Sequence, residues 1–324
     1  MVKYRNIIKR KNYLNQLAKA HEVTYYKRSE SEIIDELVKN GHKEKLDYLE
    51  DQFKFSSSHL TLCQLEEFWP EHTSSPEKLL SYLIKKGVIN STNIDTEWQP
   101  ELRERPQLCA IKHEGSAVFL KFVEKKTSVR KSGYGSAISE YAQFRSFVIV
   151  YGEEPHIQMR CPFKEIKKYM EFLLTFIGFG KPCKYFTVPK LTKKNAAKMC
   201  EYLSAGVASR HIILPATVGS VLFHGTKGTD LSTDNTYEEI NKAIEKLGLP
   251  TDDTADEKCI FKYKDTKTSI EIETTFEVQY KKGYFKFLKE VPECVVDHVL
   301  DTLILVDLED RKESMSESAA TSEE

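Results

Sequence analysis

Apolar residues recur at helical spacing along the first hundred positions of the chain. Ile7, Leu14 and Leu17 fall on one face of a basic stretch that covers residues 1–20. Ser29 and Glu32 form a capping-box pattern ahead of the next apolar stripe. The pattern predicts helices over residues 1–20, 29–41 and 43–53.

Two more helices are predicted at residues 61–69 and 75–87. Thr61 and Gln64 form a second capping-box pattern, and Pro76 suits the first turn of the next helix, where its missing N–H is not needed. The order helix, turn, helix over residues 60–90 resembles the start of a winged-helix domain. Residues 90–105 do not alternate as the β-hairpin of a winged helix would, so an ordinary helical bundle is the alternative interpretation.

From residue 107 onward the pattern becomes that of strands. Residues 117–123 are rich in β-branched and aromatic side chains, and further strands are predicted at 144–151 and 156–160. Pro162 then opens an amphipathic helix that ends at Gly178. A strand and a helix are expected after it, at residues 185–188 and 193–203.

The C-terminal third repeats this order of strands, proline and amphipathic helix. Pro292 opens the helix, and the strands before it are predicted at residues 259–263, 269–273, 276–280 and 284–288. Two interpretations stay open: a duplicated strand–helix unit, or two α+β units that share the order by chance.

These elements predict an α+β protein with a helical, helix-turn-helix-like N-terminal domain and two strand-rich α+β units. The helical domain is expected at residues 1–95, a basic α+β domain at 96–205 and an acidic α+β domain at 206–310. Residues 311–324 consist mainly of Ser, Glu and Ala without a pattern, which predicts a disordered acidic tail.

The composition is that of a globular protein, with 40% hydrophobic, 11% aromatic and 30% charged residues. This is too apolar for a disordered chain and too polar for a membrane protein. The longest apolar stretch, Ile212 to Phe223, contains Pro215 and is shorter than the roughly 20 residues of a membrane span. The basic N-terminus has no apolar run behind it, so we expect neither a membrane partner nor a secretory signal.

The 7 cysteines are widely spaced, and none forms a C-x-x-C pair. Disulfide frameworks and zinc sites need clustered ligands, so reduced thiols and a cytoplasmic location are expected. The 9 histidines show no metal-ligand spacing, although His211 and His224 beside an apolar strand could converge with a cysteine. No glycine-rich phosphate loop is present. The sequence therefore predicts no metal and no cofactor.

The net charge of −1 conceals a separation along the chain. Residues 101–210 carry 20 basic and 10 acidic side chains, whereas residues 211–324 carry 13 basic and 24 acidic ones. The basic middle segment favours DNA or RNA as a partner. The acidic C-terminal segment, of the same chain or of a second copy, is the alternative partner.

The basic excess is densest at residues 125–135, which are predicted to form a mobile loop between two strands. Four basic side chains fall within seven residues, so the loop suits a phosphate backbone, with Tyr134 stacking on a base or sugar. Lys164, Lys167 and Lys168 add charge on the following helix. The candidate nucleic-acid-binding residues are Lys125, Lys126, Arg130, Lys131, Tyr134, Lys9, Arg10, Lys11, Lys85 and Lys86.

No nucleophile motif is present, and no catalytic residue is assigned. One pattern favours a catalytic site. A class of Mg²⁺-dependent nucleases has an acidic residue, then an apolar strand, then the spacing E-x-K. This chain has the same order in Glu114, the strand at 117–123, Glu124 and Lys126. The E-x-K spacing also arises by chance in a charged chain. We therefore expect a nucleic-acid-binding protein without catalytic activity, regulatory or part of a defence or maintenance complex. The alternatives are an assembly subunit or homo-oligomer joined through its basic and acidic segments, and then the nuclease.

Overall fold

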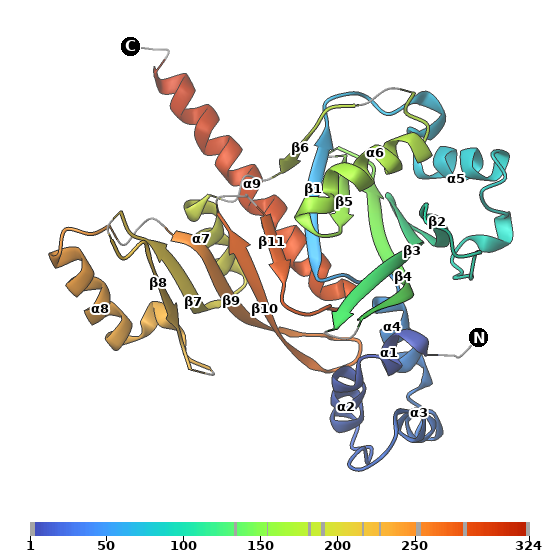
Figure 1. Ribbon diagram of the computed structural model, residues 1–324, viewed down its shortest axis with the longest axis horizontal. Helices are drawn as coiled ribbons and strands as arrows, with labels where there is room; N and C mark the ends of the chain where they lie inside the picture. The colour runs from blue at the N-terminus through green and yellow to red at the C-terminus, as the bar shows by residue number, and fades with distance from the viewer. Residues whose placement is uncertain are drawn as a thin grey trace. The chain divides into compact units, whose positions relative to one another are not determined.

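The computed structural model describes residues 4–132, 135–153, 155–180, 183–188, 192–215, 217–226, 228–250, 254–280 and 284–321. The predicted α+β class is confirmed, because a helical N-terminal part precedes antiparallel strands interleaved with further helices (Figure 1). The chain divides into two compact units. Unit 1 combines residues 1–58 with residues 189–324, and unit 2 spans residues 59–188.

Unit 1 is therefore discontinuous in sequence, whereas the segments expected from the sequence, with boundaries after residues 95, 205 and 310, are continuous. Which of these segments folds on its own stays a prediction.

The predicted N-terminal helices are present in unit 1, with the first divided in two. They are α1 (Arg5–Ile8), α2 (Lys11–Ala20), α3 (Glu30–Lys39) and α4 (Lys43–Gln52). The capping box of α3 forms as predicted, with Ser29 and Glu32 each satisfying the other's backbone N–H. Glu50 of α4 accepts hydrogen bonds from the N–H groups of Asn6 and Ile7 at 2.9 and 2.8 Å, so a side chain satisfies free amides at the start of α1.

The strands of unit 1 pair antiparallel in the order β11–β10–β9–β7–β8. Their bounds are Gly206–Ile213 (β7), Ser220–His224 (β8), Thr254–Lys264 (β9), Glu271–Gln279 (β10) and Tyr284–Phe287 (β11). The prediction of separate strands at 269–273 and 276–280 is wrong, because Thr274 and Thr275 remain in the ladder opposite Phe261 and Ile260. Threonine suits a strand, so nothing ends β10 there.

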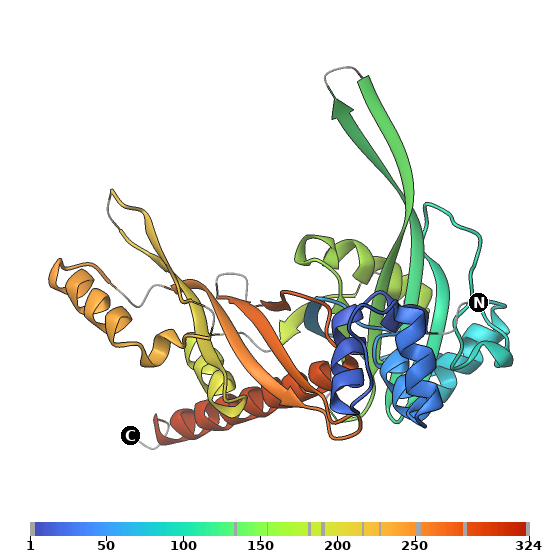
Figure 2. The same ribbon diagram turned by 90° about the horizontal axis from the view of Figure 1, so that it is seen from below.

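The helices of unit 1 that follow are α7 (Lys193–Tyr202), α8 (Asn235–Lys246) and α9 (Glu293–Thr321). α9 lies across one face of the unit 1 strands (Figures 1 and 2), where the ring of His298 is 5.2 Å from that of Tyr263. The helix continues to Thr321, where the sequence led us to expect a disordered tail from Arg311. Alanine and glutamate are good helix formers, and Lys198 holds Glu313 at 2.7 Å, which favours the added turns.

Unit 2 is built on strands paired in the order β2–β3–β4–β5–β1, with β6 on the other side of β1. They are β1 (His59–Leu65), β2 (Gln107–Glu114), β3 (Ala117–Ser132), β4 (Gly135–Val150), β5 (His156–Arg160) and β6 (Tyr185–Val188). The predicted helix at 61–69 is wrong: its first residues form β1, in which Thr61 pairs with Met159 and Leu65 with Tyr185. Pairing on both edges outweighs a local capping pattern. The helix-turn-helix interpretation of residues 60–90 therefore fails.

Two α-helices complete the described part of unit 2: α5 (Pro76–Lys85), with Pro76 in its first turn as predicted, and α6 (Ile166–Phe176). α6 covers one face of the strands, with the Phe122 and Phe172 rings 5.2 Å apart and perpendicular. Leu120, Phe147 and Met170 are fully buried between them. Short 3₁₀ turns lie at Glu71–Thr73, Ser91–Asn93, Phe163–Glu165 and Leu231–Thr233. Among the helices within the described ranges, none is both long and apolar enough to cross a lipid bilayer.

Candidate functional site

The basic residues at 125–132 lie on a two-stranded ribbon that leaves the body of unit 2. β2 pairs with β3 only as far as Val123, and β5 pairs with β4 only from Ser146 onward. Beyond those points β3 and β4 continue as partners of each other, and Figure 2 shows them extending together well past the other strands of the unit. We call residues 124–132 and 135–143 the arm.

The predicted loop at 125–135 is therefore wrong as far as Ser132, because these residues form a strand in continuous register with β4. The hydrophobic pattern carries no signal for a strand whose two faces both meet solvent. Arg130 and Lys131 lie opposite Ala137 and Ser136 in the ladder. Tyr134 lies outside the described residues, so its predicted stacking role stays a prediction.

Apolar side chains are exposed on both faces of the arm. Val129 and Ile138 are directly opposite each other and are 55% and 70% exposed. Tyr141, which is 50% exposed, lies opposite Lys126 on the other face. Directly opposed residues of an antiparallel pair share a face, so the arm presents a small aliphatic surface on one side and a lysine beside an aromatic ring on the other.

A buried carboxylate fixes the base of the arm against α6. The Glu124 side chain is 2% exposed and accepts a hydrogen bond from the Tyr169 hydroxyl. The ammonium groups of Lys126 and Lys168 lie 3.0 and 3.2 Å from its two oxygens. Burial opposes ionisation, but the bonds from Tyr169, Lys126 and Lys168 outweigh it and hold the Glu124 pKa below its usual value. Glu124 is therefore an ionised carboxylate that binds two lysines at the base of the arm.

The charge around the arm is positive after pairing is taken into account. Lys125 pairs with Glu140 across the arm at 2.6 Å, and Arg145 pairs with Glu165 at 2.8 Å. Lys126 and Lys168 share the single carboxylate of Glu124, so one positive charge there is uncompensated. Two more lysines are exposed nearby in sequence: Lys164 in the 3₁₀ turn before α6, and Lys167 in the first turn of α6. The base of the arm and the start of α6 thus form a surface suited to anions.

The structure does not bring all the predicted residues into one unit. Lys9, Arg10 and Lys11 belong to unit 1, where Arg10 bonds to Glu290 and Lys11 lies 3.0 Å from Glu30. Their charges are thus partly neutralised within unit 1.

Lys85 and Lys86 belong to unit 2 and line a hollow of about 670 Å³ on α5. Lys78, His72 and Glu77 line it as well. No sequence pattern indicated this hollow, which three lysines and one glutamate line together with His72.

Part of the basic excess of residues 101–210 is neutralised inside unit 1 by the acidic C-terminal segment. Lys194 and Lys198 on α7 lie 2.6 and 2.7 Å from Glu313 on α9. Arg210 on β7 lies 3.1 Å from Glu257 on β9. The basic and acidic segments therefore meet within one chain at these points, while the arm cations lie in unit 2.

The residues considered for a Mg²⁺ site are not brought together. Glu114 lies opposite Ala117 at one end of β3, and Ala117 is seven residues before Glu124 on that strand. At about 3.3 Å per residue the two positions are roughly 23 Å apart, so one metal ion cannot bind both carboxylates. His211 lies 2.9 Å from Asp256. Within the described ranges, no group of three His, Cys, Asp or Glu side chains is placed to hold a metal.

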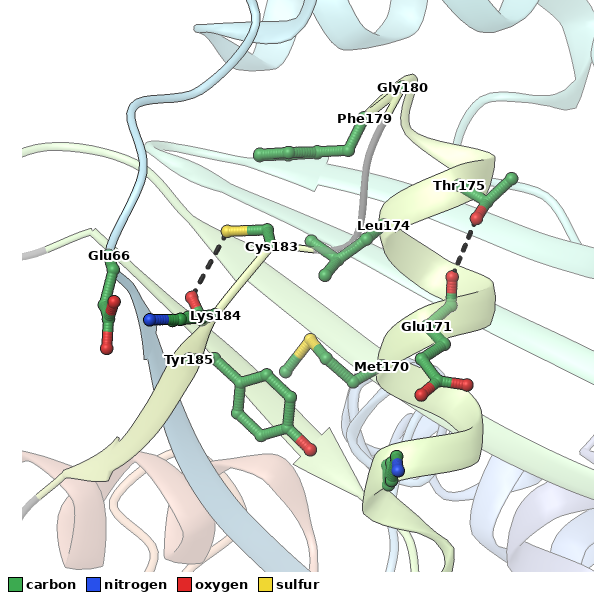
Figure 3. Close-up of a pocket in the computed structure, with 11 residues that line it drawn as sticks. Glu66, Met170, Glu171, Leu174, Thr175, Phe179, Gly180, Cys183, Lys184 and Tyr185 are labelled. Carbon is green, nitrogen blue, oxygen red and sulfur yellow. Dashed lines mark hydrogen bonds between the residues drawn. The ribbon is translucent and has the colours of Figure 1, made fainter.

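A second concavity in unit 2 was not signalled by the sequence. It has a volume of about 610 Å³ and lies between α6 and the segment that leads into β6 (Figure 3). Met170, Leu174 and Cys183 form its buried part, whereas Lys167 and Lys184 lie at its exposed edge with Glu66 and Glu171. Two lysines and two glutamates balance there, so the pocket shows no preference for one sign of charge.

We compared the chain with protein-family models, with curated proteins and with solved structures, and nothing matches it.

Proposed function

We propose that this protein binds duplex DNA through the arm and the lysines at its base. The observation that carries the proposal is the placement of Lys125, Lys126, Arg130 and Lys131 on a two-stranded ribbon that pairs with no other strand in the described part of unit 2. A ribbon of this kind fits the major groove of B-form DNA, which admits a helix or two paired strands. The deep, narrow major groove of A-form RNA does not admit it.

The dimensions of the arm agree with this mode of binding. Residues 124–132 span about 30 Å at 3.3 Å per residue, which is close to one turn of B-form DNA. Lysine and arginine along the ribbon would contact phosphates on the groove edges, and Lys126 next to Tyr141 offers a cation and a ring at one point. Lys168 extends the same positive surface onto α6.

Titration of a labelled DNA duplex of about two helical turns with the full chain, followed by fluorescence anisotropy, tests the proposal. We expect affinity to fall steeply with salt, with a slope of roughly 0.9 for each phosphate contacted. The quadruple variant Lys125→Ala, Lys126→Ala, Arg130→Ala, Lys131→Ala should lower that slope by about 3.6. Replacing residues 127–140 by Asn-Gly joins Lys126 to the opposed Tyr141 by a tight turn. This removes Arg130 and Lys131 but keeps Lys125 and Lys126, so it should lower the slope by about 1.8.

The matched control removes the same number of charges from exposed positions of unit 1, with Lys39, Lys43, Lys246 and Lys289 changed to alanine. It should bind as the wild type does. Equal losses of affinity in the control and the arm variants would show that binding depends only on the overall positive charge of the protein. No binding at low salt would overturn the proposal. Tighter binding of single strands that depends on Tyr141 would show instead that the protein binds single-stranded DNA by stacking bases on this ring.

The exposed aliphatic pair Val129 and Ile138 favours a second candidate function, assembly with another copy of this chain. Both edges of the arm carry backbone groups that the other strands of unit 2 do not cover, and such edges pair readily with another ribbon. Sedimentation at several protein concentrations tests it. A monomer at every concentration and salt, or an oligomer unchanged by Val129→Thr with Ile138→Thr, would exclude assembly through the arm.

A further inference from the structure

Two cysteine thiols meet inside unit 1, far from the arm in sequence. Cys200 lies near the end of α7 and Cys259 lies in the middle of β9, 59 positions later, and their Sγ atoms are 3.1 Å apart. Cys259 is 1% exposed, whereas Cys200 is partly exposed. The pair therefore combines a partly exposed cysteine with a buried one, and their sulfurs are in direct contact.

The elements that carry the two sulfurs hold them in place. β9 pairs on both edges, with Val207 of β7 and Phe276 of β10 opposite Cys259. α7 begins at the cap formed by Thr192, and its Lys198 side chain bonds to α9. A disulfide bond has an S–S length of about 2.05 Å. The sulfurs are thus about one ångström from bonding distance, on a sheet strand and a helix that are both anchored.

We propose that Cys200 and Cys259 form a hydroperoxide-responsive site that closes to a reversible disulfide bond joining α7 to β9. In the first step the Cys200 sulfur attacks the O–O bond of hydrogen peroxide, which yields a sulfenic acid and water. In the second step the Cys259 thiol displaces the hydroxyl group from that sulfur, its proton leaves with the hydroxyl as a second water, and the S–S bond forms. Both electrons taken up by the peroxide come from the two thiols.

The surroundings assign the two roles. Cys200 meets the peroxide first because it is the more exposed of the two residues. The contact with Cys200 and burial both raise the pKa of Cys259, so this cysteine stays a protonated thiol in the folded protein. A buried thiol is protected from direct oxidation but lies next to the sulfenic acid when it forms. The short separation then favours the disulfide over further oxidation of Cys200.

The bond would restrict the part of unit 1 that contains the ion pairs between α7 and α9. It closes the loop from residue 200 to residue 259, which contains β7, β8 and α8. Constraining so long a loop lowers the conformational entropy of the unfolded chain, and α7 could no longer separate from the sheet. Oxidation would therefore stabilise unit 1 without moving its backbone far.

Treatment of the reduced full chain with a small excess of hydrogen peroxide, followed by non-reducing peptide mapping, tests the site. We expect a peptide pair linked through Cys200 and Cys259, an intact mass lower by two hydrogen atoms, and full reversal by dithiothreitol. The linked pair should be absent in Cys200→Ser. Cys294→Ser removes another half-buried thiol of the same unit and should leave the linkage unchanged.

A second variant keeps the test independent of disulfide detection. In Cys259→Ala the sulfenic acid of Cys200 has no partner, so it should accumulate and react with a dimedone probe, while the wild type shows little labelling. The oxidised wild type should also unfold at a higher temperature than the reduced form, with no such shift in Cys200→Ser. A wild type in which Cys200 proceeds to sulfinic acid, or links to a different cysteine, or does not react, would overturn the proposal.

Discussion

The hydroxyl group of Tyr169 donates a hydrogen bond to the carboxylate of Glu124, and this contact joins α6 to the first residue of the arm. Both side chains are almost completely buried. A charged group in such a position is stable only when donors surround it, and Lys126 and Lys168 supply the others. The point where the arm leaves the sheet is therefore held against α6 by polar contacts.

Tyr169→Phe removes one donor from a buried carboxylate and leaves the ring in place. We expect the free energy of unfolding to fall by about 1–3 kcal/mol, because a buried charged acceptor loses a partner. Denaturant titration followed by circular dichroism measures it. Tyr202→Phe is the matched control, because its hydroxyl bonds to Glu309 at 2.8 Å at an exposed site. Equal losses in the two variants would show that burial of Glu124 does not matter.

Glu124 should also make the stability of the protein depend on pH. Its pKa in the folded state lies below its ordinary value of about 4.3, so its contribution is complete above about pH 5 and is lost as the pH falls through the folded pKa. The difference in unfolding free energy between the wild type and Glu124→Gln should be constant from neutral pH down to about pH 5 and then shrink. Glu114→Gln, which replaces a carboxylate at an exposed position, is the matched control. A difference that grows at low pH would contradict the assignment.

Glu313 should titrate at unusually low pH. Hydrogen bonds from Lys194 and Lys198 lower the pKa of this carboxyl to about 2. Carboxyl carbon chemical shifts measured by NMR across an acid titration would show it. Replacing Lys194 and Lys198 by alanine should return the pKa toward the ordinary value for glutamate, because both donors are lost. An unchanged pKa in that variant would mean that the α7–α9 contacts do not form in solution.

Shortening the arm should leave unit 2 folded. The exposed side chains of Val129 and Ile138 bury little surface, and the pairing of β3 with β2 ends before the segment that is removed. We expect the Asn-Gly variant to retain its circular dichroism signal and to change the free energy of unfolding by about 0.5 kcal/mol or less. Loss of cooperative unfolding would show instead that the arm contributes to the core.

Local pattern was enough to predict most helices and many strands. The capping box at Ser29 and Glu32, Pro76 in a first turn, and the strands at 156–160 and 185–188 appear as expected. The prediction failed where pairing partners decided the conformation. Thr61 to Leu65 has a helix-start pattern but lies between two strands, and residues 125–132 look like a loop although they pair along their whole length with β4.

The candidate site was predictable only in part. The density of Lys125, Lys126, Arg130 and Lys131 is visible in the sequence, and so is the imbalance between basic and acidic segments. No pattern predicted that Glu124 would be a buried anchor, because its partners Lys168 and Tyr169 come from a helix more than forty residues later.

The sequence by itself determined the α+β class, the order of the elements and the segment with the most positive charge, because these follow from local periodicity and composition. Only the tertiary structure decided that residues 1–58 join residues 189–324 in one unit, that the basic segment is a ribbon rather than a loop, and that Cys200 meets Cys259. Each of these depends on contacts between positions far apart in the chain. The local pattern of a segment carries no information about which distant residues will pack against that segment.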